Sequence, residues 1–295
     1  MANLKEVRNR IVSITSTQQI TKAMKMVSAA KLRRAQDAII QMRPYANKLQ
    51  EILQNVSGSV DASEGGQFST VRDVKSVLIV VVTSNRGLCG AFNMNVIKRA
   101  NHLAKNEYKN CKVSVLCVGK KANDFFKKTE YNIVGTDLPK RLHELYDSLT
   151  FDNVAPVAEM VMKAFADAQF DKVEIIYNKF KNAAVQEVVI EQFLPVAPPK
   201  NNGTTKQANL DFIFEPNQAA IVRDLIPKSL KVQFYKTLLD SHASEHGARM
   251  TSMHKATDNA GALIKELKLS YNKARQAAIT NEILEIVGGA EALKG

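Results

Sequence analysis

Hydrophobic positions near the end of the chain repeat with the spacing of a coiled coil. After Pro227 there is no further proline, and before residue 288 the only glycines are Gly247 and Gly261. Apolar residues there are alternately four and three residues apart, which is the repeat of a long helix that wraps around a partner helix. His242, His246 and Arg249 interrupt it. The seam comprises Val232, Tyr235, Leu239, Met253, Ala256, Ala260, Leu263, Leu267, Ala274 and Ala277.

The first 56 residues show a second repeat of this kind. They contain no glycine and one proline, Pro44. Ile20, Met24 and Val27 lie off the seam, on another face, so we expect the middle of this helix to contact something different from its ends. The seam itself is apolar at its ends and polar in its middle: Leu4, Val7, Ile11, Ile14, Gln18, Thr21, Lys25, Ser28, Leu32, Ala35, Ile39 and Met42.

Two long helices at opposite ends of one chain, each with an apolar seam, bury these seams most simply by pairing with each other. If both leave the same globular body, they form an antiparallel two-helix coiled coil. The C-terminal helix is the longer of the two, so we expect its end to extend without a partner helix.

The middle of the chain alternates between strand and helix patterns. Residues 75–83 are a continuous Val/Ile/Leu run, which is typical of a strand buried on both faces. Alternation of this kind predicts a small, mostly parallel, Rossmann-like α/β sheet with an antiparallel edge. The expected strands are 75–83, 112–118, 131–135, 172–177 and 185–193, and the expected helices are 93–106, 120–128 and 153–168.

These patterns predict an α/β fold class with four regions in order. Residues 195–209 are rich in Pro, Asn, Gly and Lys and read as a linker, and 211–214 read as an edge strand. The expected regions are an N-terminal coiled-coil helix at 1–57, an α/β domain at 73–194, a linker with an edge strand at 195–215, and a C-terminal coiled-coil helix at 216–295.

The charge requires an anionic or acidic partner. The chain has a net charge of +12, and the N-terminal helix alone carries ten Lys or Arg residues against three acids. Nucleic acid, an anionic membrane face and an acidic protein all fit this charge. The sequence has no apolar run of membrane-spanning length and does not begin with a secretory signal, so we expect a soluble intracellular protein. The three cysteines, Cys89, Cys111 and Cys117, are expected to be free thiols.

Two segments could carry chemistry. The turn at 83–90 lies between a strand and a helix, where α/β folds bind phosphates, but it matches no phosphate-binding motif and also fits a simple tight turn. His242, Glu245 and His246 fit the H-x-x-E-H pattern of zinc hydrolases, although Asp258 is the only candidate third ligand. Polar coiled-coil positions explain the same residues. The basic N-terminal helix could bind nucleic acid, but it has little aromatic interleaving.

The residues from Ile279 to Ala292 have the form [IV]-T-x-E-x-x-[DE]-x-x-x-G-A-x-[SAKR]. This segment closely resembles the signature of the gamma subunit family of F-type ATP synthases, the central rotor shaft. Blocks at 19–33, 86–90, 177–180, 256–259 and 269–276 also resemble the family, in its order and over nearly the whole length.

The resemblance implies a non-catalytic shaft that transmits torque between the membrane c-ring and the catalytic hexamer of alpha and beta subunits, driven by a proton or sodium flow. It implies the alpha, beta and epsilon subunits and the c-ring as partners, no nucleic acid, and no catalytic residue, cofactor or metal. Glu215 would face the c-ring and epsilon side. The residues expected to contact the hexamer are Lys22, Met24, Lys25, Arg33, Arg34, Arg275, Gln276, Thr280 and Glu282. The neighbouring Lys31 would face the same acidic surface.

The resemblance also bears on regulation and location. The cysteine pair that chloroplast-type gamma subunits carry is missing from the middle of this sequence, so no thiol regulation is expected. We expect a peripheral protein on the cytoplasmic face of a bacterial plasma membrane.

Overall fold

The structure is a computed structural model, and it describes residues 4–57, 66–133, 136, 138–139, 142–196 and 218–292. The chain divides into two compact units. Unit 1 combines the chain up to Ala29 with the chain from Arg249 onward, and unit 2 comprises Ala30–Ala248. Two long helices, α1 (Leu4–Ser57) and α5 (Gln218–Ala292), each contribute to both units. The expected long helices at the two ends of the chain are therefore confirmed.

Unit 2 is built on a four-stranded sheet with the order β2-β1-β3-β4. Strands β1 (Ser76–Val82), β2 (Lys112–Val118) and β3 (Lys172–Phe180) are parallel, and β4 (Gln186–Leu194) is antiparallel to β3. The apolar run of β1 lies at the centre of this sheet, and all but its first residue are buried. The mostly parallel sheet with an antiparallel edge is thus confirmed.

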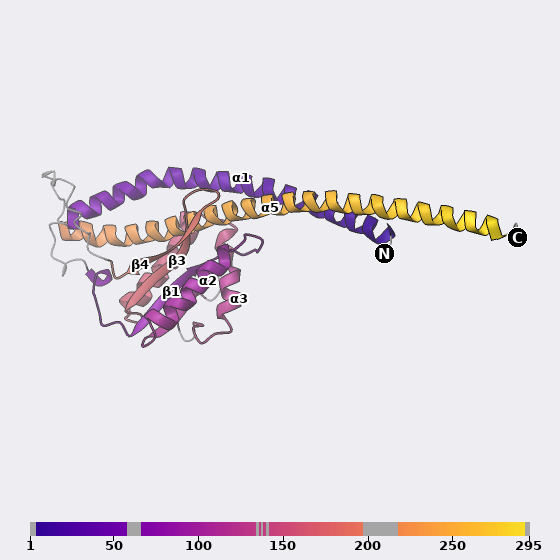
Figure 1. Cartoon of the computed structure of the whole chain (residues 1–295). Coiled ribbons are helices and arrows are strands. Elements are labelled where there is room, and N and C mark those ends of the chain that lie inside the picture. Colours follow the sequence, from indigo (N-terminus) through magenta and orange to yellow (C-terminus); the bar gives the residue numbers. More distant parts are fainter. Residues whose placement is uncertain are drawn as a thin grey trace. The chain divides into compact units, whose positions relative to one another are not determined.

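Helices cover both faces of the sheet (Figure 1). Residues 77, 79 and 81 of β1 pack in one core with α2 (Phe92–His102), its π-helical extension Leu103–Glu107 and α3 (Lys120–Phe126). Residues 78, 80 and 82 pack in a second core with α4 (Phe151–Ala166) and the first part of α5. Because successive side chains of a strand point to opposite faces, α2 and α3 lie on one face and α4 on the other.

The turn from β2 into α3 requires a glycine. Gly119 has a φ of 103°, and a Cβ atom at this position would lie 2.1 Å from the carbonyl oxygen of Thr83. Thr83 therefore lies close to the backbone of Gly119, and its hydroxyl accepts a hydrogen bond from the backbone N–H of Ala122 at 2.9 Å. Only glycine adopts this conformation at this spacing without strain.

One expected strand is wrong in its described part. Residues 131–133 form no strand, and Asn132 makes only an isolated parallel bridge with Val115. Tyr131 and Ile133 favour a strand, but this segment pairs with the edge of β2 at a single point. The other expected strands and helices are found with shifts of a few residues. The strand expected at 211–214 and most of the linker lie outside the described residues, and the division into four regions stays a prediction.

Candidate functional site

The two long helices pair antiparallel in unit 1, in agreement with the expected coiled coil. The side-chain amide of Gln18 donates to the carbonyl oxygen of Thr257 at 3.4 Å, and the hydroxyl oxygens of Thr21 and Thr257 are 2.9 Å apart. Further along α1, Lys25 Nζ lies 3.4 Å from Nδ1 of His254. Residue numbers rise along α1 as they fall along α5, so the helices run in opposite directions.

The seam predicted for α1 is confirmed, because every residue in it is buried or half-buried. Its polar middle is matched by polar partners on α5, since Gln18 and Thr21 both meet Thr257. A Cβ atom at Gly261 would lie 3.0 Å from the Gln18 amide nitrogen, so the small residue allows this side chain to approach.

The seam predicted for the end of α5 is partly wrong. Leu263 is 37% exposed, whereas the adjacent Ile264 is half-buried. The other predicted members from Met253 onward, which are Met253, Ala256, Ala260, Leu267, Ala274 and Ala277, are covered, and so are Thr257, Ile264, Tyr271 and Ala278, which the prediction left out. In unit 2 the predicted seam residue Tyr235 packs against Phe151 of α4, with ring centroids 5.8 Å apart. It therefore faces the sheet domain.

The expected contact residues of α1 differ in exposure. Lys22, Arg33 and Arg34 are exposed, whereas Met24 and Lys25 are half-buried. Lys25 approaches His254, which itself lies 3.4 Å from Asp258. Lys22, Arg33 and Arg34 are thus accessible to a partner, and Lys25 also contributes to the contact between the helices.

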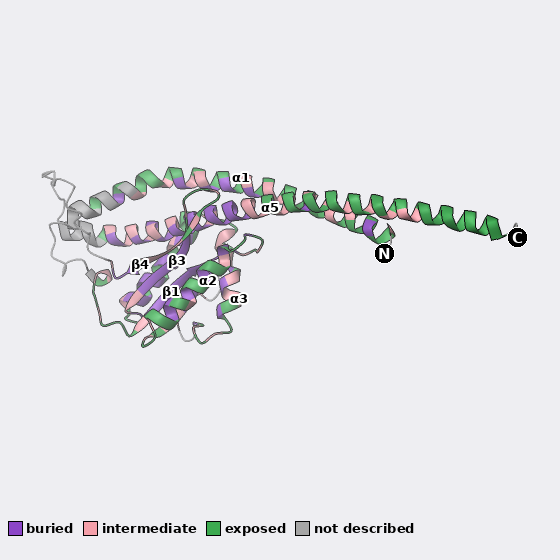
Figure 2. Cartoon of the chain, viewed as in Figure 1, coloured by how far each residue is buried: buried purple, intermediate pink, exposed green. Residues whose placement is uncertain are grey.

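The expected contact residues of α5 are all exposed. They lie toward the end of the helix, where every residue from 281 to 292 is exposed (Figure 2). The hydroxyl of Thr280 donates to the carbonyl oxygen of Gln276 at 2.9 Å, which keeps the hydroxyl on the helix surface. Glu215 lies outside the described residues.

Both helices carry exposed apolar residues that the sequence analysis did not assign to a site. On α1, Val12, Ile20, Met26 and Val27 are each more than half exposed. At about 100° per residue they lie on the side of the helix opposite the seam. The sequence signal for this exposed apolar surface was the position of Ile20 and Val27 off the seam. On α5 the exposed large apolar residues are Leu263, Leu269, Ile279, Ile283, Leu284, Ile286 and Val287.

The histidine motif lies on α5 inside unit 2. His242 Nε2 and His246 Nε2 are 3.1 Å apart, and the His242 ring stacks on Tyr146 with centroids 6.0 Å apart. Glu245 and His246 are buried. No group of three potential metal ligands occurs among the residues that the structure describes. The geometry therefore favours a packing role for the motif.

Polar groups of the turn at 83–90 form hydrogen bonds within the turn and with Asn93. The backbone N–H of Ser84 donates to the side-chain oxygen of Asn93 at 2.9 Å, and the Ser84 hydroxyl donates to the carbonyl oxygen of Arg86 at 2.6 Å. Leu88 and Gly90 have positive φ values, which close the turn. These contacts support the tight-turn interpretation over a phosphate site.

All three cysteines are free thiols in the structure. Burial raises the pKa of the Cys117 thiol to about 12, which keeps it protonated and unreactive at neutral pH. Cys89 is buried beside Asn93, whose amide lies 3.2 Å from its sulfur atom.

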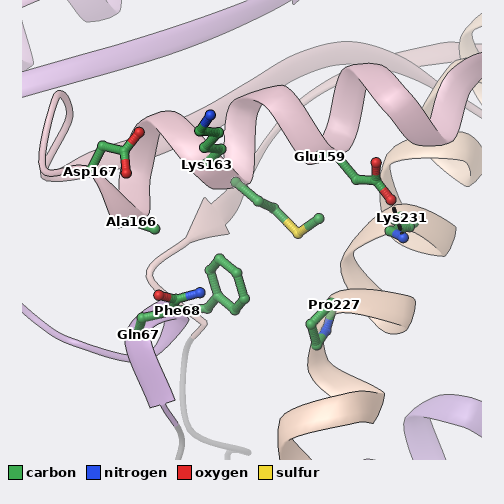
Figure 3. Close-up of a pocket in the computed structure, with 9 residues that line it drawn as sticks. Gln67, Phe68, Glu159, Lys163, Ala166, Asp167, Pro227 and Lys231 are labelled. Atoms are coloured by element: carbon green, nitrogen blue, oxygen red, sulfur yellow. Dashed lines mark ion pairs between the residues drawn. The ribbon is translucent and has the colours of Figure 1, made fainter.

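Unit 2 also has an open hollow of about 360 Å³ between α4, residues 67–68 and the first part of α5 (Figure 3). Glu159 and Lys231 form an ion pair at its rim. Its described lining contains no His, Cys or Ser side chain. The lining residues are Gln67, Phe68, Glu159, Met162, Lys163, Ala166, Asp167, Pro227 and Lys231.

No helix among the described residues is long and apolar enough to cross a membrane.

Comparisons with known proteins agree on one family. A family model described as ATP synthase matches residues 3–293. The ATP synthase gamma chains of Christiangramia forsetii and Flavobacterium psychrophilum are 58% and 59% identical, and each alignment covers all of both chains.

Solved structures are similar in fold. A chain of the Tetrahymena thermophila mitochondrial ATP synthase central stalk and c-ring is 26% identical with a TM-score of 0.56, and the match covers 80% of this chain and 99% of that one. A chain of the Euglena gracilis mitochondrial ATP synthase rotor is 22% identical with a TM-score of 0.65, and the match covers 94% and 98% of the two chains. With nearly the whole chain matched by the family model and by full-length relatives, this chain belongs to the ATP synthase gamma chain family.

Proposed function

We propose that this chain is the central rotor shaft of an F-type ATP synthase, a non-catalytic subunit that transmits torque between the membrane c-ring and the catalytic hexamer. The observation that carries the proposal is the double role of α5. Its first part packs in the core of the sheet domain through Ile226, Leu230 and Phe234, and its later part pairs with α1. One continuous helix of 75 residues therefore belongs to both units.

The hexamer would be contacted by the two sets of surface residues on the long helices. On α1 these are Lys22, Met24, Lys25, Arg33 and Arg34. Exposed ion pairs contribute only about 0–1 kcal/mol each. Many weak contacts suit a bearing surface, because it must rotate past its partner without being trapped in one position. On α5 the set is Arg275, Gln276, Thr280 and Glu282.

The other end of the shaft would bind the c-ring and the epsilon subunit, with Glu215 on that side. The assembly would be peripheral to the cytoplasmic face of a bacterial plasma membrane. Membership of the family supports a position beside the c-ring, as does the 26% identical chain from the Tetrahymena thermophila ATP synthase central stalk and c-ring.

The proposal is tested by reversing the charges of the α1 contact set. The variant Lys22→Glu, Lys25→Glu, Arg33→Glu and Arg34→Glu is assembled into the complete enzyme in membrane vesicles. We expect ATP-driven proton pumping to fall at least threefold per ATP hydrolysed, because the shaft loses its electrostatic contact with the acidic surface of the hexamer. Pumping is followed with a pH-sensitive dye alongside ATP hydrolysis.

A matched control reverses four exposed lysines of the sheet domain, Lys75, Lys163, Lys181 and Lys228. This control should retain the ratio of pumping to hydrolysis. A normal ratio in the α1 variant, with normal assembly, would contradict the bearing role of these residues.

A further inference from the structure

The two helical layers of the sheet domain have opposite charge. Residues 92–131, which contain α2 and α3, hold nine Lys or Arg residues and three Asp or Glu residues, a net charge of +6. Residues 143–171, which contain α4, hold one Lys and six Asp or Glu residues, a net charge of −5. Since α2 and α3 lie on one face of the sheet and α4 on the other, the domain is strongly polarised.

The positive charge of the α2–α3 layer is accessible. Lys98 and Lys105 are exposed on α2 and its extension, Lys120 is exposed at the start of α3, and Lys128 is exposed two residues after its end. Helices α2 and α3 contact one another and pack on the same sheet face, so their outer surfaces point the same way (Figure 1). We call the outer surface of residues 92–131 the basic face.

The acidic residues of this layer are largely neutralised locally. Glu107 pairs with Arg99 at 3.5 Å, and Asp124 pairs with Lys127 at 3.2 Å. A hydrogen bond from Lys127 lowers the pKa of the Asp124 carboxyl. By contrast, Lys98, Lys105, Lys109, Lys112, Lys120 and Lys128 form no ion pair within the part of the chain that the structure describes.

The residue types of the basic face favour a lipid surface over a protein. Eight of its nine cations are lysines, which protein interfaces tend to exclude in favour of arginine. A lysine is a mobile point charge, and it suits a fluid plane of anionic headgroups. Phe125 on α3 and Met94 on α2 are 40% and 49% exposed on the same layer, so they could enter the headgroup region.

We propose that the basic face of the sheet domain, through Lys98, Lys105, Lys120 and Lys128, binds the anionic headgroups of a phospholipid bilayer. The acidic residues on the α4 side of the sheet orient the domain, because an anionic bilayer repels them. This contact is separate from the proposed bearing surface on α1 and stands on the charge and exposure of the sheet domain alone.

The test uses the purified full-length chain and sedimentation with vesicles. One set of vesicles is phosphatidylcholine alone, and the other contains about one third phosphatidylglycerol. We expect binding to the anionic vesicles only, and its loss at about 0.5 M salt, where charges are screened beyond a few ångströms. The variant Lys98→Gln, Lys105→Gln, Lys120→Gln and Lys128→Gln should bind at least tenfold more weakly, because each lysine near the bilayer adds to the attraction.

The matched control is Lys22→Gln, Lys25→Gln, Arg33→Gln and Arg34→Gln, which removes the same charge from α1. It should lose clearly less binding to the anionic vesicles than the variant of the basic face. A second variant, Phe125→Ser, should weaken binding while leaving its salt dependence unchanged, since it removes apolar contact alone. Circular dichroism checks that each variant is folded.

Three results would overturn the proposal. The first is no binding to anionic vesicles, and the second is an equal loss of binding in the α1 control. The third is a carbodiimide cross-link from Lys98 or Lys120 to carboxylates of another subunit in the delipidated complex. This result would mean that the basic face binds an acidic protein. The rotor assignment is tested separately by proton pumping, so each idea can fail without the other.

Discussion

At the scale of single residues, Asp240 is a buried acidic side chain of unit 2. It lies on α5 and is 4% exposed. Burial raises the pKa of its carboxyl, and the nearby Glu191 of β4 adds to the rise, while Lys236, Arg43 and Lys179 oppose it. Glu191 also accepts a hydrogen bond from the Tyr177 hydroxyl at 2.7 Å. The charges that act on Asp240 thus come from α1, β3 and β4 as well as from α5 itself.

Asp240 should make the stability of the chain depend on pH. Its pKa is raised in the folded state, so folded Asp240 keeps its proton at a pH where the unfolded chain has lost it. Its contribution is therefore complete below the ordinary aspartate pKa of about 3.9 and declines as the pH rises toward the folded pKa. The slope for one group is at most about 1.4 kcal/mol per pH unit.

Asp240→Asn removes this titration. We expect the variant to gain stability relative to the unmodified chain as the pH is raised from about 4 to about 7, measured by urea unfolding. Asp147→Asn, at an exposed aspartate, is the control and should leave the profile unchanged. Parallel profiles for Asp240→Asn and the unmodified chain would rule out a raised pKa.

At the scale of elements, α1 is a helix with two apolar stripes. The first is the seam that meets α5, and the second contains Val12, Ile20, Met26 and Val27. A helix in a two-helix coiled coil needs only the first stripe. The second stripe is therefore available for a further partner, consistent with the proposed hexamer.

The choice of Ile264 over Leu263 as the covered residue of α5 gives a prediction at the scale of elements. Ile264→Asp should lower the free energy of unfolding by about 1–3 kcal/mol, because it places a charge at a covered position between the helices. Leu263→Asp, one residue earlier and 37% exposed, should cost less than about 1 kcal/mol. Thermal and urea unfolding compare the two. Equal losses at both positions would mean that the seam is not at Ile264.

At the scale of the whole molecule, the end of α5 is one region where apolar side chains are exposed. Along the end of α5, Ile279, Ile283 and Ile286 are 48%, 54% and 70% exposed. They are spaced four and three residues apart, which is the spacing of an apolar stripe. Surface of this kind marks an interaction site, since a monomer gains nothing from exposing it.

Replacing the three isoleucines of this stripe should weaken binding to a partner without lowering the stability of the chain. Ile279→Gln, Ile283→Gln and Ile286→Gln together should change the free energy of unfolding of the isolated chain by less than about 1 kcal/mol, because the side chains are already in water. The same variant should bind the alpha and beta hexamer at least tenfold more weakly, measured by gel filtration or calorimetry. Lys265→Gln, Lys268→Gln and Lys273→Gln on the same helix serve as the control and should bind normally. Unchanged hexamer binding in the isoleucine variant would contradict a role for this stripe.

The sequence by itself determined the elements and their class. The two glycine-poor heptad segments predicted α1 and α5, and the run at 75–83 predicted the central strand. Both signals are local, because periodicity and β-branched composition depend only on neighbours along the chain. The same periodicity placed every member of the α1 seam at a covered position.

Only the tertiary structure decided which of two neighbouring apolar residues is covered by the other helix. It also decided which segments lie on which face of the sheet. Leu263 and Ile264 are both apolar, so the position of α1 alone selects Ile264 for the seam. Residues 131–133 read as a strand but form a single bridge, because strand pairing depends on how much of the edge of β2 the chain reaches. The opposite charges of the two helical layers also emerge only after folding, since the sheet places residues 92–131 and 143–171 on opposite faces.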